Sequence, residues 1–319
     1  IDIKKKEITT SRGSSIKYDR LLLATGGLSF VPPIPGAGKK GVFTLRTLKD
    51  AIAIREYNEK LSHNTLIIGG GVLGLEAGYG LMRTGRHNIT VVEFFSRLLP
   101  RQMDPVGSEI LERQMKKMGF SFYPGAKSRE ITGRDKAEAL IMEDGSTIEC
   151  DMIIISAGVR PNSALAQKLG LKIEKGLVVN DRMETGIPDI YAAGDLVQHN
   201  GICYGIWPAA EKQGETAGIN MAGGNSVYQG TTISNTLKVA DIDLVAAGDI
   251  DAEGEKESIT VKDIDNFIYK KIVIGDNRIT GVILYGDIRE KKKILRAIES
   301  GMDISGIKED LKKWNLEGL

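Results

Sequence analysis

The 319-residue chain has few of the residues that build metal centres and disulfide frameworks. It contains two cysteines, Cys150 and Cys203, and three scattered histidines. The cysteines lie far apart in the sequence, which excludes a CxxC redox pair, a zinc knuckle and a disulfide framework. Scattered histidines argue against a metal site, so we expect none. Two isolated thiols are typical of a reducing compartment, and we therefore expect a cytoplasmic location.

The chain also lacks an excess of charge of either sign. Forty-three Lys and Arg residues against 42 Asp and Glu give a formal net charge of +1. Such a chain has no electrostatic field suited to nucleic acid or to an anionic membrane, and we expect neither as a partner. The uncharged stretch Leu21–Gly38 contains Pro32, Pro33 and Pro35, which excludes a membrane-spanning helix there.

Glycine, by contrast, is abundant. The chain has 38 glycines in 319 residues, or about 12%, against a typical ~7%. No collagen-like period explains this excess, so many backbone positions must form tight turns or approach a ligand closely. Hydrophobic residues make up 41% of the chain and charged residues 27%, which is typical of a folded globular protein of two or three domains.

The order of predicted elements divides the chain into four stretches. They are residues 1–44, with short extended segments and a Pro/Gly-rich linker; residues 45–157, where strands and helices alternate; residues 158–229, with a strand pair and a helix over Trp207–Met221; and residues 230–319, with short alternating strands and two terminal helices. The second stretch is typical of an α/β fold and the last of a small α+β domain. Because the chain opens on Ile within a strand-forming segment, we expect it to be a fragment.

Two local patterns within residues 45–157 are specific. A helix is predicted over Met103–Gly119, with Asp104 as its N-cap, Pro105 at the first helical position and Gly119 as its C-terminal stop. The pair Asp144-Gly145 stands between two strand-like segments and predicts a two-residue hairpin turn.

The strongest pattern is a strand, a glycine cluster and a helix between Asn64 and Gly85. Gly69, Gly71 and Gly74 form GxGxxG, a motif that is weak alone but specific between a strand and a helix. Gly69 would permit the sharp turn, Gly71 would let the backbone touch a pyrophosphate, and Gly74 would let the helix pack closely on the strand. The N-terminus of the helix would then stabilise the phosphate charge.

Glu93 ends the next predicted strand, about 20 positions after Gly74, which is the spacing of the acid in dinucleotide-binding units. A carboxylate there accepts hydrogen bonds from the ribose hydroxyls of NAD and repels the 2′-phosphate of NADP. Arg97 is the only nearby cation that could favour NADP. We therefore predict NADH as the ligand, the alternative being a glycine turn without a ligand and a solvated acid.

Short segments on both sides of this unit carry a resemblance to a known family. They are ATGG (Ala24–Gly27), GGGVLGLE (Gly69–Glu76), the acid Glu93, SAGVRPN (Ser156–Asn162) and YAAGD (Tyr191–Asp195). In this order they resemble the pyridine nucleotide-disulfide oxidoreductase superfamily, the flavoproteins with two dinucleotide-binding domains. The resemblance covers about residues 16–221. It implies a Rossmann-type NAD-binding domain inserted in a partial FAD-binding domain, followed by a small C-terminal α+β domain.

The resemblance also assigns the four stretches. Residues 1–44 would be a remnant of the FAD-binding domain with a linker, and residues 45–157 the NAD-binding domain. Residues 158–229 would be the second part of the FAD-binding domain, and residues 230–319 a C-terminal α+β interface domain. Nothing upstream of Ala24 supplies the strand–GxGxxG–helix unit that holds the ADP half of FAD. The resemblance thus implies FAD in the intact protein and leaves its retention by this fragment in doubt.

Several residues acquire roles through the resemblance. Thr25 and Gly26 would lie against the FAD, and Asp195 would bind its ribityl or phosphate part, with Gly194 allowing the approach. The helix that starts near Trp207 would direct its positive end at the flavin pyrimidine ring. From the residues alone, Asp195 could equally be a turn residue or a helix cap.

Two further residues would face the nicotinamide. The resemblance implies that Glu76 contacts the nicotinamide carboxamide and that Gly158 lies near the ring. From the residues alone, Glu76 could instead be an exposed helical acid or a partner in an ion pair. No side chain is needed as an acid or a base for hydride transfer, so we assign no catalytic residue.

The last stretch resembles both the C-terminal domain of NADH:rubredoxin oxidoreductases and the flavin domain of NADH-dependent nitrite reductases. This implies hydride transfer from NADH to flavin, and electron transfer onward to a rubredoxin-like protein or a fused reductase module. Two alternatives stay open: an NADH oxidase, peroxidase or disulfide reductase with its redox cysteine in a missing region, and a non-catalytic nucleotide-binding module. The electron acceptor and the oligomeric state, including a homodimer, also stay open.

Overall fold

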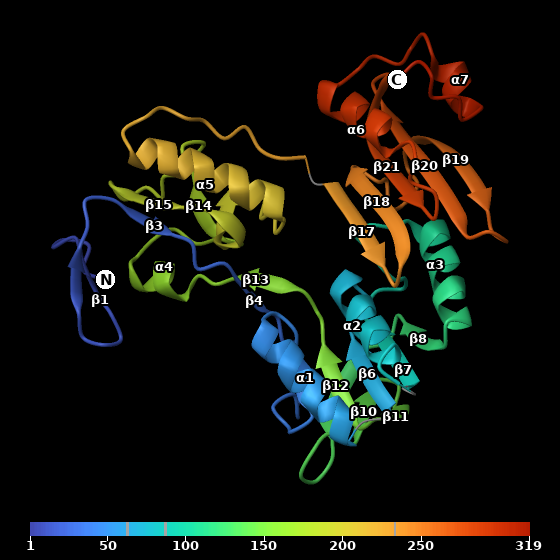
Figure 1. Ribbon diagram of the computed structural model, residues 1–319, viewed down its shortest axis with the longest axis horizontal. Coiled ribbons are helices and arrows are strands. Elements are labelled where there is room, and N and C mark those ends of the chain that lie inside the picture. Colours follow the sequence, from blue (N-terminus) through green and yellow to red (C-terminus); the bar gives the residue numbers. More distant parts are fainter. Residues whose placement is uncertain (62–63, 86–87, 233) are drawn as a thin grey trace. The chain divides into compact units, whose positions relative to one another are not determined.

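The computed structural model describes residues 1–61, 64–85, 88–232 and 234–319. His63 and His87, two of the three histidines, lie outside the described residues. The chain divides into two compact units (Figure 1). The first unit combines residues 1–30 with 159–233, and the second combines residues 31–158 with 234–319. The stretches expected to form the NAD-binding domain and the C-terminal domain therefore share one unit.

A parallel sheet forms the centre of residues 31–158. Its strand order is β5-β12-β6-β7-β8, with all neighbours parallel. The strands are β5 (Val42–Thr44), β12 (Met152–Ile155), β6 (Asn64–Ile68), β7 (Asn88–Glu93) and β8 (Phe120–Pro124). This sheet confirms the α/β fold predicted from the alternation of strands and helices.

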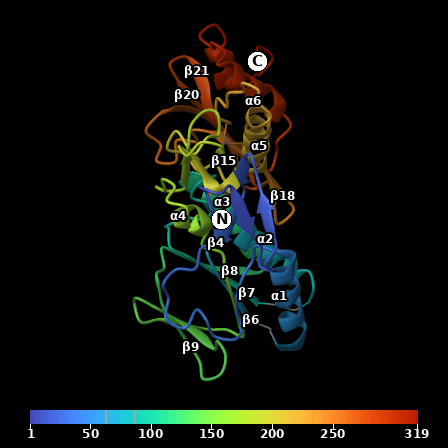
Figure 2. The same cartoon turned by 90° about the vertical axis from the view of Figure 1, so that its left-hand side faces the viewer.

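Alternate residues of these strands face two different layers. Ile67 of β6 joins the core beneath the helices, whereas Leu66 and Ile68 pack against a second, antiparallel sheet. The helices are α1 (Leu48–Leu61), α2 (Val72–Met82) and α3 (Pro105–Lys117), and the antiparallel strands are β9 (Ser128–Thr132), β10 (Ala139–Met142) and β11 (Thr147–Glu149). Figure 2 shows α1 and β9 on opposite sides of the parallel sheet.

The predicted N-cap of α3 and the predicted hairpin between β10 and β11 are both present, but the hairpin loop has three residues, 143–145, rather than two, because the Met142 N–H donates to the Ser146 carbonyl oxygen. Asp104 is the N-cap of α3, where its side chain accepts a hydrogen bond from the Gly107 N–H at 2.9 Å, and Pro105 is the first helical residue. The turn at Gly145, whose φ is +86°, joins β10 and β11 as an antiparallel hairpin. Only glycine adopts this left-handed conformation without strain.

The C-terminal part of the second unit is a five-stranded antiparallel sheet with two helices. Its strand order is β17-β18-β21-β20-β19. The elements are β17 (Ser234–Val239), β18 (Ile242–Gly248), β19 (Glu257–Asp263), β20 (Ile268–Gly275), β21 (Arg278–Tyr285), α6 (Lys291–Ser300) and α7 (Lys308–Lys312). One face packs on α6 and α7, while the other, through Tyr269 and Tyr285, joins the core formed by α2 and α3. This shared core explains why the C-terminal part belongs to the same unit as the parallel sheet.

A buried polar cluster crosses that shared core. The Tyr269 hydroxyl donates a hydrogen bond to Asp104 Oδ2 at 2.5 Å, and Lys271 Nζ lies 3.2 Å from the same oxygen. Lys271 also donates to the Asp251 carbonyl oxygen at 2.8 Å, and its side chain is 3% exposed. Burial and the adjacent Asp104 carboxylate raise the pKa of Tyr269 above its usual range. Tyr269 therefore stays protonated as the donor that joins β20 to the start of α3.

Replacing Lys271 should destabilise this unit strongly. Lys271→Met leaves Asp104 and Asp251 without their cation in a buried site, which typically costs about 3–5 kcal/mol. Chemical denaturation measures this loss in the free energy of unfolding. Lys308→Met serves as the control, since Lys308 pairs with a half-exposed Glu257 and should cost less than about 1 kcal/mol. Equal effects of the two substitutions would contradict a structural role for the buried cluster.

Short strands and one long helix form the first unit. Its strand pairs are β1 (Glu7–Thr9) with β2 (Ser15–Lys17), β3 (Leu21–Leu23) with β15 (Ile190–Ala192), β4 (Gly27–Ser29) with β13 (Val159–Pro161), and β14 (Leu177–Val179) with β16 (Val197–His199). Its helices are α4 (Ala164–Lys168) and α5 (Trp207–Met221), the latter with the predicted bounds. Among the described residues, no helix combines the length and apolar character that a bilayer span needs.

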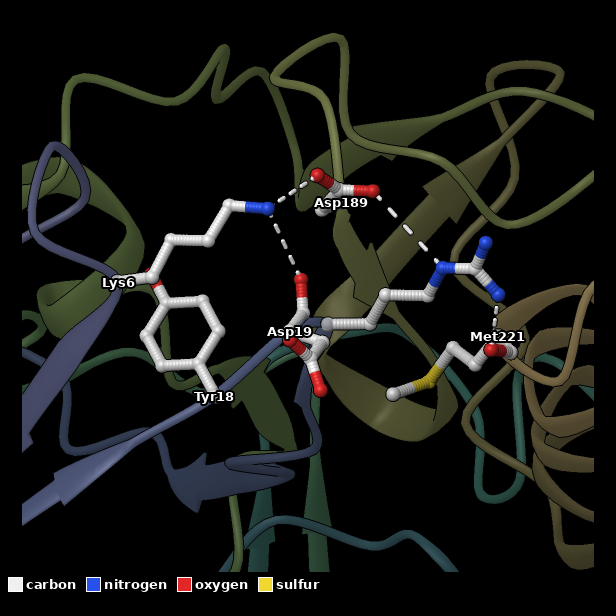
Figure 3. Close-up of a pocket in the computed structure, with 6 residues that line it drawn as sticks. Lys6, Tyr18, Asp19, Asp189 and Met221 are labelled. Atoms are coloured by element: carbon white, nitrogen blue, oxygen red, sulfur yellow. Dashed lines mark hydrogen bonds and ion pairs between the residues drawn. The ribbon is translucent and has the colours of Figure 1, made fainter.

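An ion-pair cluster attaches the N-terminal strands to the rest of the first unit. Asp189, which directly precedes β15, accepts a hydrogen bond from Lys6 Nζ at 2.6 Å and lies 3.8 Å from Arg20 Nε (Figure 3). Lys6 also donates to the Asp19 carbonyl oxygen at 3.1 Å, and Arg20 donates to the Met221 carbonyl oxygen at the end of α5. The hydrogen bond from Lys6 holds the pKa of Asp189 below its ordinary value. The cluster thus joins residues 1–30 to both β15 and α5.

Candidate functional site

The predicted glycine turn lies between β6 and α2 and has the geometry that its motif requires. At Gly69, whose φ is +116°, a Cβ would overlap the Ser156 carbonyl oxygen. At Gly74, a Cβ would overlap the Gly69 carbonyl oxygen and contact Ile67. Gly69 thus permits the turn, and Gly74 permits α2 to pack on β6. Both positions exclude any side chain for reasons internal to the protein.

Gly71 differs from these two glycines. A Cβ at Gly71 would have no heavy atom within 4 Å, and its backbone is extended, with φ −80° and ψ 173°. The protein itself therefore does not require glycine at this position. Gly71 is the N-cap of α2 and makes no side-chain capping hydrogen bond, and the first turn of the helix contains no acid. The open space therefore lies at an uncapped helix N-terminus, where backbone N–H groups and the helix dipole favour an anion.

Glu93 lies beside this turn at the end of β7. Its side chain is buried, and both carboxylate oxygens accept main-chain hydrogen bonds: Oε2 from the Gly70 N–H at 2.5 Å and Oε1 from the Phe95 N–H at 2.8 Å. The spacing of the motif predicts this carboxylate near the glycine turn, and the structure brings the two into direct contact. A carboxylate held by two N–H groups has a fixed position and cannot rotate away from a ligand.

Arg97, the cation considered for NADP, is engaged elsewhere in the second unit. Its Nη2 donates to Glu253 Oε1 at 3.0 Å and its Nε donates to the Met103 carbonyl oxygen at 3.3 Å. The charge of Arg97 is therefore paired with the C-terminal part of the chain.

Two aromatic residues next to Glu93 were not singled out from the sequence. Phe94 and Phe95 are 63% and 56% exposed, and their rings meet edge to face with centroids 5.5 Å apart. Exposed aromatic pairs are unusual because they leave a large apolar area in water. The sequence signal was present as two consecutive phenylalanines directly after the acid of the dinucleotide unit.

Gly158 marks the other side of the turn. It follows β12, which pairs with β6 on the side opposite to β7. Its φ is +101°, and a Cβ would have no heavy atom within 4 Å. A ligand that crosses the end of β6 thus has Glu93 on one side and Gly158 on the other, as expected at the carboxyl ends of parallel strands.

Glu76 lies in the second turn of α2, and its carboxylate is partly engaged. Its Oε1 accepts a hydrogen bond from the Ala240 N–H, in the turn between β17 and β18, at 2.7 Å. From the sequence, Glu76 could be an exposed acid or a partner in an ion pair. The structure instead shows it as the acceptor of a main-chain hydrogen bond. The sequence could not reveal it, because the two residues are far apart along the chain.

The expected flavin residues all lie in the first unit. Because β3 and β15 are parallel neighbours, the segments that follow them, ATGG and AAGD, lie side by side. A Cβ at Gly27 would lie 3.7 Å from the Asp195 Cβ. The two short motifs, which are weak signals separately, therefore meet at one edge of the unit.

Asn162 and Gln213, which were not identified from the sequence as site residues, hold these segments in place. Asn162 accepts a hydrogen bond from Thr25 Oγ1 through its carbonyl oxygen at 2.7 Å, and its own N–H donates to the Gly26 carbonyl oxygen at 2.8 Å. The buried Gln213 accepts a hydrogen bond from the Gly194 N–H at 2.9 Å through Oε1. Asn162 is the last residue of the SAGVRPN segment (Ser156–Asn162), so the sequence pattern included this residue without indicating its contact with Thr25 and Gly26.

The N-terminus of α5 offers a further open position in the first unit. Trp207, the first residue of this helix, is 82% exposed, and the helix has no side-chain cap and no acid in its first turn. Its N–H groups are therefore free of a side-chain capping partner, as expected where a helix dipole acts on an electron-rich ligand. Gly26, with φ +65°, likewise has open space where a Cβ would be.

The parallel sheet with its glycine turn defines a Rossmann-type α/β protein. The antiparallel sheet of β17–β21 adds a C-terminal domain that only some proteins of this class have. Residues 1–214 match the pyridine nucleotide-disulphide oxidoreductase family, and residues 234–302 match the rubredoxin NAD+ reductase C-terminal domain. The chain therefore belongs to the pyridine nucleotide-disulphide oxidoreductase family. The resemblance recognised from the short motifs is confirmed.

Relatives of known name match nearly the whole chain. A nitrite reductase [NAD(P)H] of Bacillus subtilis is 37% identical over 306 residues, which cover 96% of this chain and 38% of that protein. An NADH-rubredoxin oxidoreductase of Clostridium acetobutylicum is 30% identical over 308 residues, covering 96% of this chain and 76% of that protein. The structure of a NAD-dependent persulfide reductase from A. fulgidus superposes with a TM-score of 0.86 at 28% identity, covering 97% of this chain and 62% of that one. The chain thus spans about two fifths of the nitrite reductase.

The difference between the glycines of the turn yields a test of the site. Gly71→Val should lower NADH affinity at least about tenfold, because the new side chain fills the space left for a pyrophosphate. It should cost no more than about 1 kcal/mol in the free energy of unfolding, since the position is open and only the weaker N-cap preference of valine opposes it. Gly74→Ala should instead destabilise the protein by about 1–3 kcal/mol through its overlap with the Gly69 carbonyl.

Calorimetric NADH titration and chemical denaturation of each variant separate these two effects. Normal NADH binding by a folded Gly71→Val variant would contradict the assignment of the open space to the ligand.

Proposed function

We propose that the chain is the NADH-accepting part of a flavoprotein oxidoreductase that transfers electrons from NADH, through FAD, to a redox partner. The observation that carries this proposal is the open, uncapped N-terminus of α2 at Gly71, directly beside the fixed carboxylate of Glu93. This combination provides an anion site and a ribose-binding acid within one turn. The names of the relatives, among them nitrite reductase and NADH-rubredoxin oxidoreductase, support the reaction class.

In this proposal NADH lies across the carboxyl end of β6. Its pyrophosphate faces Gly71 and the first N–H groups of α2, and its adenosine ribose donates hydrogen bonds to Glu93. The adjacent rings of Phe94 and Phe95 give the adenine an apolar surface to stack on. The nicotinamide half extends to the Gly158 side of the sheet, with Glu76 as an acceptor for the carboxamide.

The residues of the first unit fit FAD in the same way. Thr25 and Gly26 follow β3, and Gly194 and Asp195 follow its parallel neighbour β15, so a flavin could meet both segments. Asp195 would accept a hydrogen bond from the ribityl or phosphate part, and the uncapped start of α5 at Trp207 would favour electron density on the ring. When bound, the flavin supplies the redox chemistry, and the protein supplies position and electrostatics.

The electron acceptor in this proposal is a small electron-transfer protein or a fused reductase module. The match of residues 234–302 to the rubredoxin NAD+ reductase C-terminal domain supports a rubredoxin-like partner. The nitrite reductase relative supports a module on the same polypeptide. Both partners accept electrons, so either is consistent with the same NADH site.

A cysteine-dependent oxidase or disulfide reductase receives no support from the two cysteines of this chain. Burial raises the pKa of Cys150 to about 12, and it also raises the pKa of Cys203. Both thiols are therefore protonated at neutral pH, whereas the thiolate is the reactive form. A relative named NADH oxidase, from Methanocaldococcus jannaschii, is 38% identical over 241 residues. Oxygen is therefore one of the electron acceptors to test.

The geometry at Glu93 predicts a preference for NADH over NADPH. The 2′-phosphate would lie against a buried carboxylate that two main-chain N–H groups hold in place, so we expect NADPH to bind at least about tenfold more weakly. Fluorescence titration with both nucleotides measures the ratio. Glu93→Gln removes the repulsion and should reduce the preference. Equal affinity of the wild-type chain for the two nucleotides would overturn the role of Glu93.

Anaerobic titration with NADH tests the reaction itself. With FAD added to saturation, the chain should bleach the visible flavin band faster than Gly71→Val does, because that variant lacks the pyrophosphate site. Repeating the assay with rubredoxin, nitrite or oxygen then distinguishes the acceptors by the rate of flavin reoxidation. A chain that binds both NADH and FAD yet never bleaches the flavin would be a nucleotide-binding module rather than an oxidoreductase.

A further inference from the structure

The turn between β17 and β18 has an unusual backbone and lies on the nucleotide-binding helix. Its two residues, Ala240 and Asp241, have positive φ angles of +50° and +62°. This is the conformation of a two-residue hairpin turn, which usually contains asparagine or glycine. An alanine in this conformation is strained, and such strain persists only where the surroundings impose it. Ala240 is 1% exposed and belongs to the core that the C-terminal sheet shares with α2.

Two hydrogen bonds fix this turn to successive turns of α2. The Ala240 N–H donates to Glu76 Oε1 at 2.7 Å, and the Tyr79 hydroxyl donates to Asp241 Oδ2 at 2.7 Å. Arg83 and Lys238 add charge around Asp241, at 3.9 Å and 3.7 Å from its carboxylate oxygens. The hydrogen bond from Tyr79 holds the pKa of Asp241 below its usual range. Asp241 therefore stays ionised and keeps the turn attached to the helix.

The consequence concerns the carboxylate of Glu76. A glutamate on a helix surface has several rotatable bonds and samples many positions. A hydrogen bond from a buried main-chain N–H to a charged oxygen selects one of them, because charge-assisted bonds are stronger than neutral ones. The β17–β18 turn supplies that N–H from Ala240 to Glu76, which lies in the second turn of α2. Glu76 is thus held in one orientation before any ligand arrives.

We propose that the β17–β18 turn is a positioning element of the NADH site, which fixes Glu76 for the nicotinamide half of the dinucleotide. This inference rests on the proposed function, because it assumes that Glu76 accepts a hydrogen bond from the nicotinamide carboxamide. Tyr79 and Asp241 are positioning residues, since they act on the ligand through Ala240 and Glu76. The C-terminal domain then contributes to NADH binding as well as to the fold.

Comparison of NADH with ADP-ribose tests this role, because ADP-ribose contains the adenosine and pyrophosphate parts but no nicotinamide. In the full chain, Tyr79→Phe and Asp241→Ala should each raise the Kd of NADH about threefold to tenfold, as expected for the loss of one hydrogen bond. The Kd of ADP-ribose should change less than about twofold. Tyr57→Phe is the matched control: the Tyr57 hydroxyl is buried with no hydrogen-bond partner among the described residues, so neither affinity should change.

A double-mutant cycle adds a second measurement. With Glu76→Gln already present, Tyr79→Phe should have little further effect on NADH, because both substitutions act through the same carboxylate. Equal weakening of NADH and ADP-ribose would show that the turn only supports α2, and would overturn the inference. So would unchanged NADH affinity, or fully additive effects in the cycle. Failure of the wild-type chain to bind NADH would instead overturn the proposed function.

Discussion

The proposed nucleotide site depends on the contact between the Glu93 carboxylate and the main chain of the glycine turn. The Gly70 N–H donates to this carboxylate, and the Gly70 carbonyl oxygen accepts from the Leu99 N–H at 3.0 Å. Both main-chain polar groups of Gly70 are therefore held, the N–H by the last residue of β7 and the carbonyl oxygen by the segment that follows it. A buried carboxylate requires such partners, since an unpaired charge there would be very costly. The same two N–H bonds that make its burial acceptable also fix the carboxylate in one position beside the glycine turn.

The segment between β7 and α3 transmits this constraint to the C-terminal domain. It begins at Phe94, beside the site, and ends at Asp104, the N-cap of α3. Asp104 is also the acceptor for Tyr269 and the partner of Lys271, and Arg97 reaches Glu253. One loop thus contacts the glycine turn at one end and the antiparallel sheet at the other. This explains why a domain that is separate in sequence belongs to the same compact unit as the nucleotide site.

The sequence predicted those features whose causes are local. The strand–glycine–helix unit, the N-cap Asp104 and the bounds of α5 depend on residues within a few positions of each other, and the structure has all three. Tertiary contacts could not be predicted in this way. The engagement of Glu76 by Ala240 and the buried position of Lys271 depend on pairs of residues more than 100 positions apart. From the sequence alone, a lysine or a glutamate is expected at the surface. Only the partners of Lys271 and Glu76 in the folded chain show that these two side chains are engaged inside the unit.

One antiparallel strand pair closes the insertion of residues 31–158 into the first unit. The chain leaves the first unit after β4 and returns to it at β13, and Ser29 pairs directly with Val159. The guanidinium of Arg160 also lies 3.7 Å from the centre of the Phe30 ring, which fixes the two segments side by side. An insertion whose ends are adjacent disturbs the host fold little. The strand pair therefore allows residues 31–158 to form a complete nucleotide-binding fold while ATGG and AAGD still meet in the first unit. The two weak motifs come together because the chain closes this pair, although more than 160 residues separate them in the sequence.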